Sequence, residues 1–430
     1  MARNMKDSGI EWIGEIPEGW EIVPVRSCFD EVRTKNTDGQ EQNALQFKSG
    51  NIISKANFNA NIDDYVADTI TNYTVVLPDT VMINGLNLNY DFKSLRVALV
   101  KEKGVITPAY LAIFPDRKKI FPQYATYLFK GYETKMAFHN MGAGIRKTLG
   151  YKEFKNQPLL LPSKEEQNKI SAYLDSKCSH IDIMLSKIRS SIEEYKKLKQ
   201  AVITQAVTKG VRGEREMRDS GVEWIGKIPK EWVIQKIKSI SSRINVGVVI
   251  RPSEYFDENG TVPFLRGINV KEYLISSDNM VYINESSNHI LSKSQVHTDD
   301  ILIVRDGSIG TSCVVPAEYD GANVVSMVIV TPSTSCDSRF ICYSLNSDVG
   351  KTQFTLTKIG SALTHTSVSA VSDIIVAVPS CAEQKEIADY LDAKCAEIDG
   401  LIAKKEQLVK ELESYKKSLI YEVVTGKREV

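Results

Sequence analysis

Apolar residues recur every seven positions in two long segments of the chain. The first segment has two such series, Leu174, Ile181, Ile188, Tyr195, Val202 and Cys178, Leu185, Ile192, Lys199, Ala206. The later segment repeats them as Leu391, Ile398, Lys405, Leu412, Leu419 and Cys395, Ile402, Val409, Lys416, Val423. Seven-residue repeats sustained over this length favour a coiled coil. We therefore predict two helices of roughly 40 residues each that pair with each other.

The start of each predicted helix carries a capping signal. Ser163 and Ser380 each follow a proline and precede a glutamate three residues later, Glu166 and Glu383. In a capping box the serine hydroxyl accepts from the backbone N–H of the glutamate, and the glutamate carboxylate accepts from the backbone N–H of the serine. The sequence predicts this reciprocal pair at both helix starts.

Between and before these segments the periodicity is different. Short apolar runs bounded by turn residues predict strands at 97–100, 301–304, 324–330 and 374–378. Residues 121–138 have helical spacing instead. The stretches Leu77–Gly85 and His297–Gly307 are similar enough to be one turn-then-strand unit that occurs twice. The fold class predicted here is α+β.

Two repeated motifs indicate a tandem duplication. "MKDSGIEWIGEIPEGW" from Met5 and "MRDSGVEWIGKIPKEW" from Met217, which we call the Trp motifs, share 11 of 16 positions. "PSKEEQNKISAYLDSKCSHID" from Pro162 and "PSCAEQKEIADYLDAKCAEID" from Pro379 share 12 of 21. Each half therefore has a Trp motif, a divergent stretch and a shared helix. The four tryptophans, which we expect to be packing anchors rather than ligand contacts, are Trp12, Trp20, Trp224 and Trp232.

Composition narrows the class of protein. The 430 residues are 42% hydrophobic and 25% charged, no apolar run reaches membrane-spanning length, and the N-terminus is polar. The seven cysteines are scattered and no CxxC occurs, which predicts neither a disulfide framework nor a zinc site. We expect a bacterial-type cytoplasmic protein with reduced thiols and no membrane contact.

The charge balance leaves two interpretations open. The chain has 54 Lys and Arg against 54 Asp and Glu, which counts against a free-standing nucleic-acid binder. Residues 117–155 nevertheless carry nine Lys and Arg against two Glu. This local excess is either a solvated helical face or a surface that faces phosphates.

One weak match to a catalytic pattern exists. Asp116, Glu133 and Lys135 resemble the PD…ExK residues with which metal-dependent nucleases hold Mg²⁺ and activate water. Glu133 and Lys135 fall in a helical segment, however, and the second half has no counterpart. The sequence has no Walker motif and no convincing cofactor loop, so we predict no cofactor, no metal and no catalysis by this chain.

The combined motifs resemble a known family. The Trp motif, "EEQNKISAYLDSKCSHID", "QAVITQAVTKG" (200–210) and "KSLIYEVVTGK" (417–427) are similar to the specificity subunit (HsdS) of type I restriction–modification systems. The resemblance covers the whole chain. It implies two mixed α/β target-recognition domains in a tandem pseudo-two-fold repeat, separated by two long helices that form an antiparallel coiled coil. It also implies binding to double-stranded DNA, one half-site per domain.

The same resemblance implies partners and domain limits. Two methyltransferase subunits would bind around the helices, and a restriction motor-nuclease subunit would cleave unmodified DNA. The expected domains are the first Trp motif and recognition domain (1–162), the central helix (163–216), the second Trp motif and recognition domain (217–379) and the C-terminal helix (380–430). Because the two recognition domains diverge, we expect an asymmetric bipartite target.

Base recognition needs hydrogen-bond donors and acceptors in polar loops. The candidates in the first domain are Asn84, Asn87, Asn89, Lys93, Arg146 and Lys147. Those in the second are Arg266, Asn269, Arg305, Thr364 and His365. Two alternative functions stay open at this point, the metal-dependent nuclease using Asp116, Glu133 and Lys135, and a coiled-coil scaffold that binds no DNA.

Overall fold

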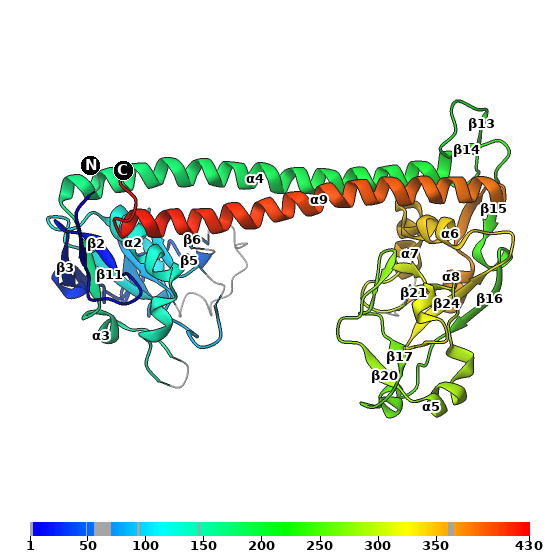
Figure 1. Ribbon diagram of the computed structural model, residues 1–430, viewed down its shortest axis with the longest axis horizontal. Helices are drawn as coiled ribbons and strands as arrows, with labels where there is room; N and C mark the ends of the chain where they lie inside the picture. Colours follow the sequence, from blue (N-terminus) through cyan, green and yellow to red (C-terminus); the bar gives the residue numbers. More distant parts are fainter. Residues whose placement is uncertain (1–2, 49, 56–69, 93–94, 145–146, 360–364) are drawn as a thin grey trace. The chain divides into compact units, whose positions relative to one another are not determined.

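Two compact units make up the chain. Unit 1 comprises Met1–Arg189 and Glu406–Val430, and unit 2 comprises Ser190–Lys405. The computed structural model describes residues 3–48, 50–55, 70–92, 95–144, 147–359 and 365–430. Each unit holds one Trp motif, one divergent stretch and parts of both long helices (Figure 1). The first and last residues of the chain therefore belong to the same unit.

The two long helices are α4, Lys164–Lys209, and α9, Cys381–Val424, of 46 and 44 residues. In each unit their segments lie side by side and antiparallel (Figure 1). In unit 1 Lys416 Nζ lies 2.6 Å from Asp182 Oδ1, and in unit 2 Lys199 Nζ lies 2.6 Å from Asp399 Oδ2. Two lysines of the heptad seams, Lys199 and Lys416, thus form salt bridges between the helices, at positions that the duplication makes equivalent.

The predicted seam residues line the helix pair. Those that are buried are Leu174, Ile181, Leu185, Ile192, Leu391, Ile398 and Leu419. Those that are half-buried are Ile188, Tyr195, Ile402, Val409 and Leu412. Cys178 and Cys395 are buried with them, and burial raises the pKa of both thiols. Both cysteines therefore act as small apolar residues of the seam.

The divergent stretch of unit 1 contains a four-stranded antiparallel sheet with the strand order β4-β11-β8-β9. These strands are β4 Phe29–Glu31, β8 Val81–Ile83, β9 Val97–Leu99 and β11 Leu111–Pro115. The other strands of the unit are β1 Met5–Asp7, β2 Glu15–Pro17, β3 Glu21–Pro24, β5 Leu45–Lys48, β6 Asn51–Ser54, β7 Thr74–Val76, β10 Gly104–Ile106 and β12 Pro158–Leu161. Its short helices are α2 Pro122–Thr134 and α3 Tyr151–Phe154.

Unit 2 repeats this sheet with the order β16-β24-β21-β22. These strands are β16 Ser241–Val246, β21 Ile301–Val304, β22 Ser312–Val314 and β24 Met327–Pro332. The others are β13 Met217–Asp219, β14 Lys227–Pro229, β15 Val233–Lys236, β17 Val262–Leu265, β18 Val270–Lys271, β19 Leu274–Ile275, β20 Val281–Ile283, β23 Asn323–Val324 and β25 Ile375–Val378. The short helices are α5 Glu285–Ile290, α6 Ser338–Asn346, α7 Asp348–Ile359 and α8 Val368–Ser372.

The strand order confirms that the same turn-then-strand unit occurs twice. β8 and β21 occupy the same position in their sheets, and each follows an aspartate with positive φ, Asp79 at 76° and Asp299 at 71°. The predicted strands are present as β9, β21, β23 with β24, and β25, and the helical spacing after residue 121 is α2. The α+β fold class is confirmed. Over the described ranges, no helix is long and apolar enough to cross a membrane.

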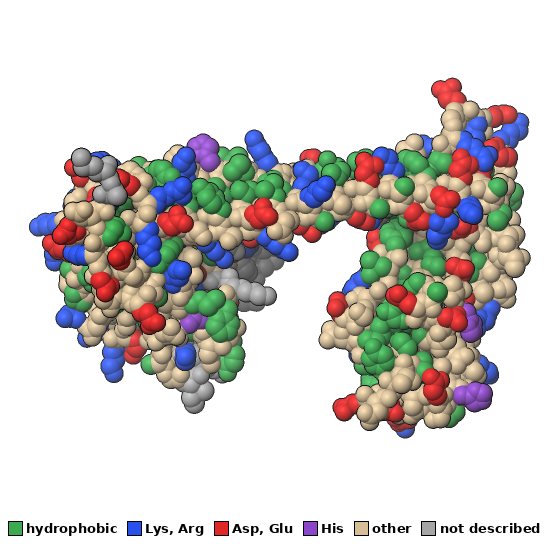
Figure 2. All heavy atoms as spheres, viewed as in Figure 1, with side chains coloured by type: hydrophobic (Ala, Val, Ile, Leu, Met, Phe, Trp, Pro, Cys, Tyr) green, Lys and Arg blue, Asp and Glu red, His purple; other side chains and the backbone are tan. Residues whose placement is uncertain are grey.

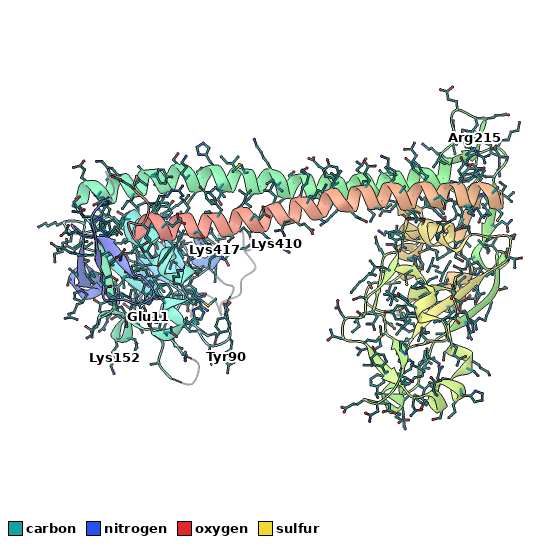
Figure 3. The ribbon with its side chains drawn as sticks, in the orientation of Figure 1. Glu11, Tyr90, Lys152, Arg215, Lys410 and Lys417 are labelled. Carbon is teal, nitrogen blue, oxygen red and sulfur yellow. The ribbon has the colours of Figure 1, made fainter. Side chains whose placement is uncertain are left out.

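The glutamate of each predicted capping box has another partner. Ser163 and Ser380 do cap their helices, because their hydroxyls accept from the N–H groups of Glu166 and Glu383 at 3.2 and 3.4 Å. The Glu166 carboxylate, however, accepts from the indole N–H of Trp20 at 2.9 Å and binds Arg3. In unit 2 Glu383 binds Arg215, which lies beside the second Trp motif in Figure 3.

This correction has a physical reason. In unit 1 the Trp20 indole and the Arg3 guanidinium bind Glu166, and in unit 2 Arg215, just before the Trp motif, binds Glu383. Each glutamate therefore contacts residues in or just before the Trp motif instead of closing a local turn. Trp20 and Trp232 are buried, as expected of packing anchors. Trp224 is different, because more than a third of its surface is exposed.

A second set of contacts attaches each recognition domain to its helix start. The buried Gln167 side chain accepts from Phe121 N–H at 2.9 Å, just before α2. Gln384 does the same with Asp337 N–H, just before α6, also at 2.9 Å. The Tyr127 and Tyr343 hydroxyls donate to the equivalent carboxylates of Asp175 and Asp392, at 2.8 and 2.7 Å. The shared sequence thus attaches both divergent stretches in one way.

Candidate nucleic-acid interface

The loop that follows β8, Asn84–Phe92, carries three of the candidates and will be called the β8 loop. Asn87 has a left-handed backbone, with φ of 53°, and its carbonyl accepts from Tyr90 N–H at 3.1 Å and Asp91 N–H at 3.0 Å. Asparagine tolerates this conformation better than most residues. The Asn87 side chain is exposed, and Asn84 and Asn89 are partly exposed. The loop therefore presents amide groups from a tightly turned backbone.

A second loop, Gly142–Leu149, is hydrogen-bonded to the β8 loop. Leu88 N–H donates to Lys147 O at 3.2 Å, and Leu149 N–H donates to Gly85 O at 2.9 Å. A Cβ at Gly85 would lie 2.5 Å from Leu149 O, so glycine allows the close approach. The structure thus brings the exposed Lys147 together with Asn84, Asn87 and Asn89. Lys93 and Arg146 lie outside the described residues.

In unit 2 the segment after β21 carries Arg305, at the place that corresponds to the β8 loop. Arg305 Nε donates to Thr366 O at 2.9 Å, and Thr366 N–H donates back to Arg305 O at 3.1 Å. This pair joins the segment to the partly exposed His365, so Arg305 and His365 are brought together. Thr364 lies outside the described residues.

Arg266 and Asn269 lie in a different turn, directly after β17. The prediction of Asn269 as a base contact is wrong, since its side chain is 0% exposed. Its amide accepts from Arg266 N–H at 3.1 Å and donates to Ser276 O at 3.1 Å and Asp278 O at 2.9 Å. Asn269 therefore shapes the turn from inside. Arg266 is partly exposed and binds the carbonyl of Asn279.

Several residues that sequence reasoning missed lie in or beside the β8 loop and in the loop after β16. Tyr90 is 72% exposed and projects from unit 1 in Figure 3, and Arg96 is buried beneath the β8 loop. In unit 2 Ile250 is 76% exposed, and the backbone carbonyl of Val248 accepts from Ser326 N–H at 3.0 Å. The candidates predicted from the sequence were all polar. An apolar residue in a Gly- and Pro-flanked loop such as "VGVVIRP" is also a signal, because thymine methyl groups are read by apolar contact.

The three residues of the nuclease alternative serve local structure. Asp116 accepts from Lys118 N–H at 3.0 Å, in the turn that follows β11. Glu133, near the end of α2, accepts from Arg96 N–H, and the Lys135 ammonium lies 4.6 Å from the Tyr421 ring centroid. Among the described residues, no group of three His, Cys, Asp or Glu side chains is arranged to hold a metal ion. The nuclease alternative is not supported.

Charges of both signs alternate over the visible face of each unit (Figure 2). Part of the basic excess in residues 117–155 has internal partners. Arg117 pairs with Asp79 at 2.6 Å, and Lys119 donates to Ser27 O at 2.8 Å. Burial lowers the pKa of Lys130, and the nearby Lys416 lowers it further. Part of the basic excess therefore has partners within unit 1 rather than being wholly free for phosphates.

Glu133 gives a pH-dependent prediction. Burial raises its pKa from 4.5 to about 7, which Arg96, Lys130 and Lys417 only partly oppose. The folded protein therefore holds this proton more tightly than the unfolded chain, and stability falls as pH rises from about 4.5 to about 7. Glu133→Gln keeps an acceptor for Arg96 N–H and removes the charge. We expect the variant to be more stable above pH 7 by about 2 kcal/mol, less than the full shift implies because the group is partly exposed.

Chemical unfolding of the full chain, followed from pH 4.5 to 8, measures the difference in stability between Glu133→Gln and the unsubstituted protein. Glu11→Gln, which removes an exposed carboxylate of the same unit (Figure 3), is the matched control and should give no such trend. An equal gain for Glu133→Gln at pH 4.5 and pH 8 would contradict the assignment.

The chain is similar in sequence to known type I restriction proteins. Residues 229–411 match the family model of the type I restriction modification DNA specificity domain. The MjaX type I restriction enzyme specificity subunit of Methanocaldococcus jannaschii is 24% identical over 431 residues, covering 96% of this chain and 95% of the relative. The MjaVIII subunit of the same organism is 24% identical over 421 residues, covering 96% and 93%. The resemblance of the chain to type I specificity subunits is confirmed.

The chain is also similar in fold to a solved structure. A chain from a study of complex assembly and conformational transition in the type I R-M system superposes with a TM-score of 0.70 at 14% identity. The alignment covers 96% of this chain and 99% of that one. The likeness in fold thus extends along almost the whole chain.

Proposed function

We propose that this chain is a specificity subunit that recognises a bipartite, asymmetric DNA target in the cytoplasm, one half-site per unit. The observation that carries the proposal is that identical contacts attach two domains whose loops differ. Gln167 and Gln384, and Tyr127 and Tyr343, make the same bonds in both units, whereas the segments after β8 and β21 differ in length and side chains. Duplicated supports with divergent loops suit two separate half-sites.

The chemistry of the loops fits base edges in the major groove. Amide side chains such as Asn84 and Asn87 can pair with adenine, and arginines such as Arg305 can pair with guanine. Lys147 adds a cation beside the amides, suited to a phosphate. The equal numbers of acidic and basic residues are consistent with partner subunits that supply further phosphate contacts.

The proposed partners are two methyltransferase subunits and one restriction motor-nuclease subunit, with all chemistry on the partners. Leu198 on α4 and Tyr415 on α9 support the number of methyltransferase copies. They are equivalent in the duplicated sequence, and each is 49% exposed. Two equivalent apolar positions on helices suit two copies of one partner.

Leu198→Glu should reduce the bound methyltransferase from two copies to one, because a buried carboxylate at an apolar contact is costly. Native mass spectrometry of the co-purified complex measures the copy number. Leu198→Met is the control and should retain two copies. Two copies with Leu198→Glu would place the docking surface elsewhere on the helices.

Methylation mapping tests the whole proposal. The chain is expressed with its methyltransferase subunit, and genomic sites are mapped, with duplex binding measured on the purified complex. We expect two different half-sites separated by a fixed spacer. Absence of specific DNA binding by the complex would favour the scaffold alternative, and Mg²⁺-dependent cleavage by the chain alone would revive the nuclease alternative.

A further inference from the structure

One buried arginine organises the β8 loop. Arg96 is 1% exposed, and its Nη1 donates to the carbonyls of Asn84 and Leu86, each at 2.9 Å. Nη2 donates to the carbonyl of Asp91 and lies 3.7 Å from the Asp91 carboxylate. The guanidinium group thus joins the beginning and the end of the loop through its backbone, and its planar fork is suited to several carbonyls at once.

The backbone of Arg96 and two neighbours hold the same loop. Asn84 N–H donates to Arg96 O at 2.8 Å, and Arg96 N–H donates to the Glu133 carboxylate on α2. The His139 ring stacks on Phe92 with centroids 5.0 Å apart, and its Nε2 is hydrogen-bonded to Asp91 O at 3.1 Å. Arg96, α2 and the segment around His139 therefore fix the loop together. Asn87 and Tyr90 remain exposed on its outer side.

We infer that Arg96 is a positioning residue for DNA recognition, which sets the sequence preference of one half-site without contacting DNA. The inference rests on the proposed function. A buried cation is retained only when it is well bonded, and its bonds here go to main-chain atoms of the loop that carries the candidate base contacts. The loop is then preformed before DNA binds, so less conformational entropy is lost on binding.

Substitution by lysine separates positioning from charge. Arg96→Lys keeps a cation, but a single ammonium cannot replace two nitrogens that donate to three carbonyls. We expect the loop to change shape, and the preference for the correct base in the half-site of unit 1 to fall by about 10- to 100-fold. The half-site of unit 2 should be unaffected, and it serves as a control within the same molecule.

The experiment measures methylation rates of the assembled complex on duplexes with single base changes in either half-site. Tyr124→Phe is the matched control, because it removes a buried hydrogen bond to Leu160 O in the same unit without touching the loop. It should lower stability and leave base preference unchanged. The salt dependence of duplex binding should stay the same for Arg96→Lys, since no phosphate contact is lost.

Four results would overturn the inference, and they differ from failure of the proposed function. The first three concern base preference. They are unchanged preference in Arg96→Lys, equal loss at both half-sites, and equal relaxation by Tyr124→Phe. A reduced salt slope would also overturn it, because it would make Arg96 a phosphate contact. If the unsubstituted complex has no two-part target, the proposed function itself fails.

Discussion

Replacing residues 21–158 with the matching stretch of a type I specificity subunit should change one half of the proposed target and leave the other half as it was. The retained supports are Trp20, Glu166, Gln167 and Asp175, and Gln167 binds backbone atoms that any donor domain supplies. Because the contacts of Gln167 and Asp175 recur in unit 2 as those of Gln384 and Asp392, each recognition domain can be exchanged on its own support.

The structure shows which protein can supply the replacement stretch, here called the donor. The donor should keep the tyrosine equivalent to Tyr127, which donates to Asp175, and a glycine equivalent to Gly131. A Cβ at Gly131 would lie 2.6 Å from a methyl group of Val424 on α9. A donor without this glycine would separate α2 from the helix pair, and a failure to fold would then say nothing about recognition.

Methylation mapping of the hybrid gives the answer. The expected result is complete replacement of one half-site at unchanged spacer length. The reciprocal exchange in unit 2, over residues 233–375, is the control and should change the other half-site. A hybrid in which both half-sites change would show that the two units do not recognise DNA independently.

The long helices could be predicted in detail because their pattern is local and repeated. Seven-residue spacing and a serine at each start correctly predicted α4 and α9. The glutamate contacts could not be predicted in the same way. Glu166 fits a capping box by sequence, but its partners Trp20 and Arg3 are more than 140 residues away in the chain. Tertiary contacts replaced the local one.

The candidate interface was only partly predictable, because polar loops have no periodicity. Asn87 and Asn269 look alike in the sequence, yet one side chain is exposed and the other is 0% exposed. Burial of a loop asparagine depends on which backbone groups need partners, and that depends on the folded turn. Arg96 was missed for the same reason, since a basic residue in a polar segment suggests DNA contact rather than a buried clamp.

Lengthening both long helices by four residues should lengthen the DNA spacer by one or two base pairs and leave both half-sites unchanged. The insertions must lie opposite each other. Ile188 and Lys405 are equivalent in the two halves of the sequence, but the Lys405 ammonium lies 5.4 Å from the Tyr195 ring centroid, so Lys405 faces Tyr195 rather than Ile188. The matched insertions therefore belong before Tyr195 and after Lys405, with residues of high helix propensity.

Pairing on both sides of the insertions should survive. Arg189 with Glu413 and Lys416 with Asp182 belong to unit 1, and Lys199 with Asp399 belongs to unit 2. Four residues in one helix alone would shift these partners and should prevent folding. Four in both restore the seam at the cost of a local stutter.

The geometry of DNA sets the expected size of the change. Four residues add about 6 Å to a helix, and base pairs are about 3.4 Å apart. Four residues also turn a helix about 40° beyond a full turn, close to the rotation of about 34° for each added base pair. Methylation mapping of the double insertion decides the matter, because a stable, active variant that keeps its original spacer would mean that helix length does not set the distance between half-sites.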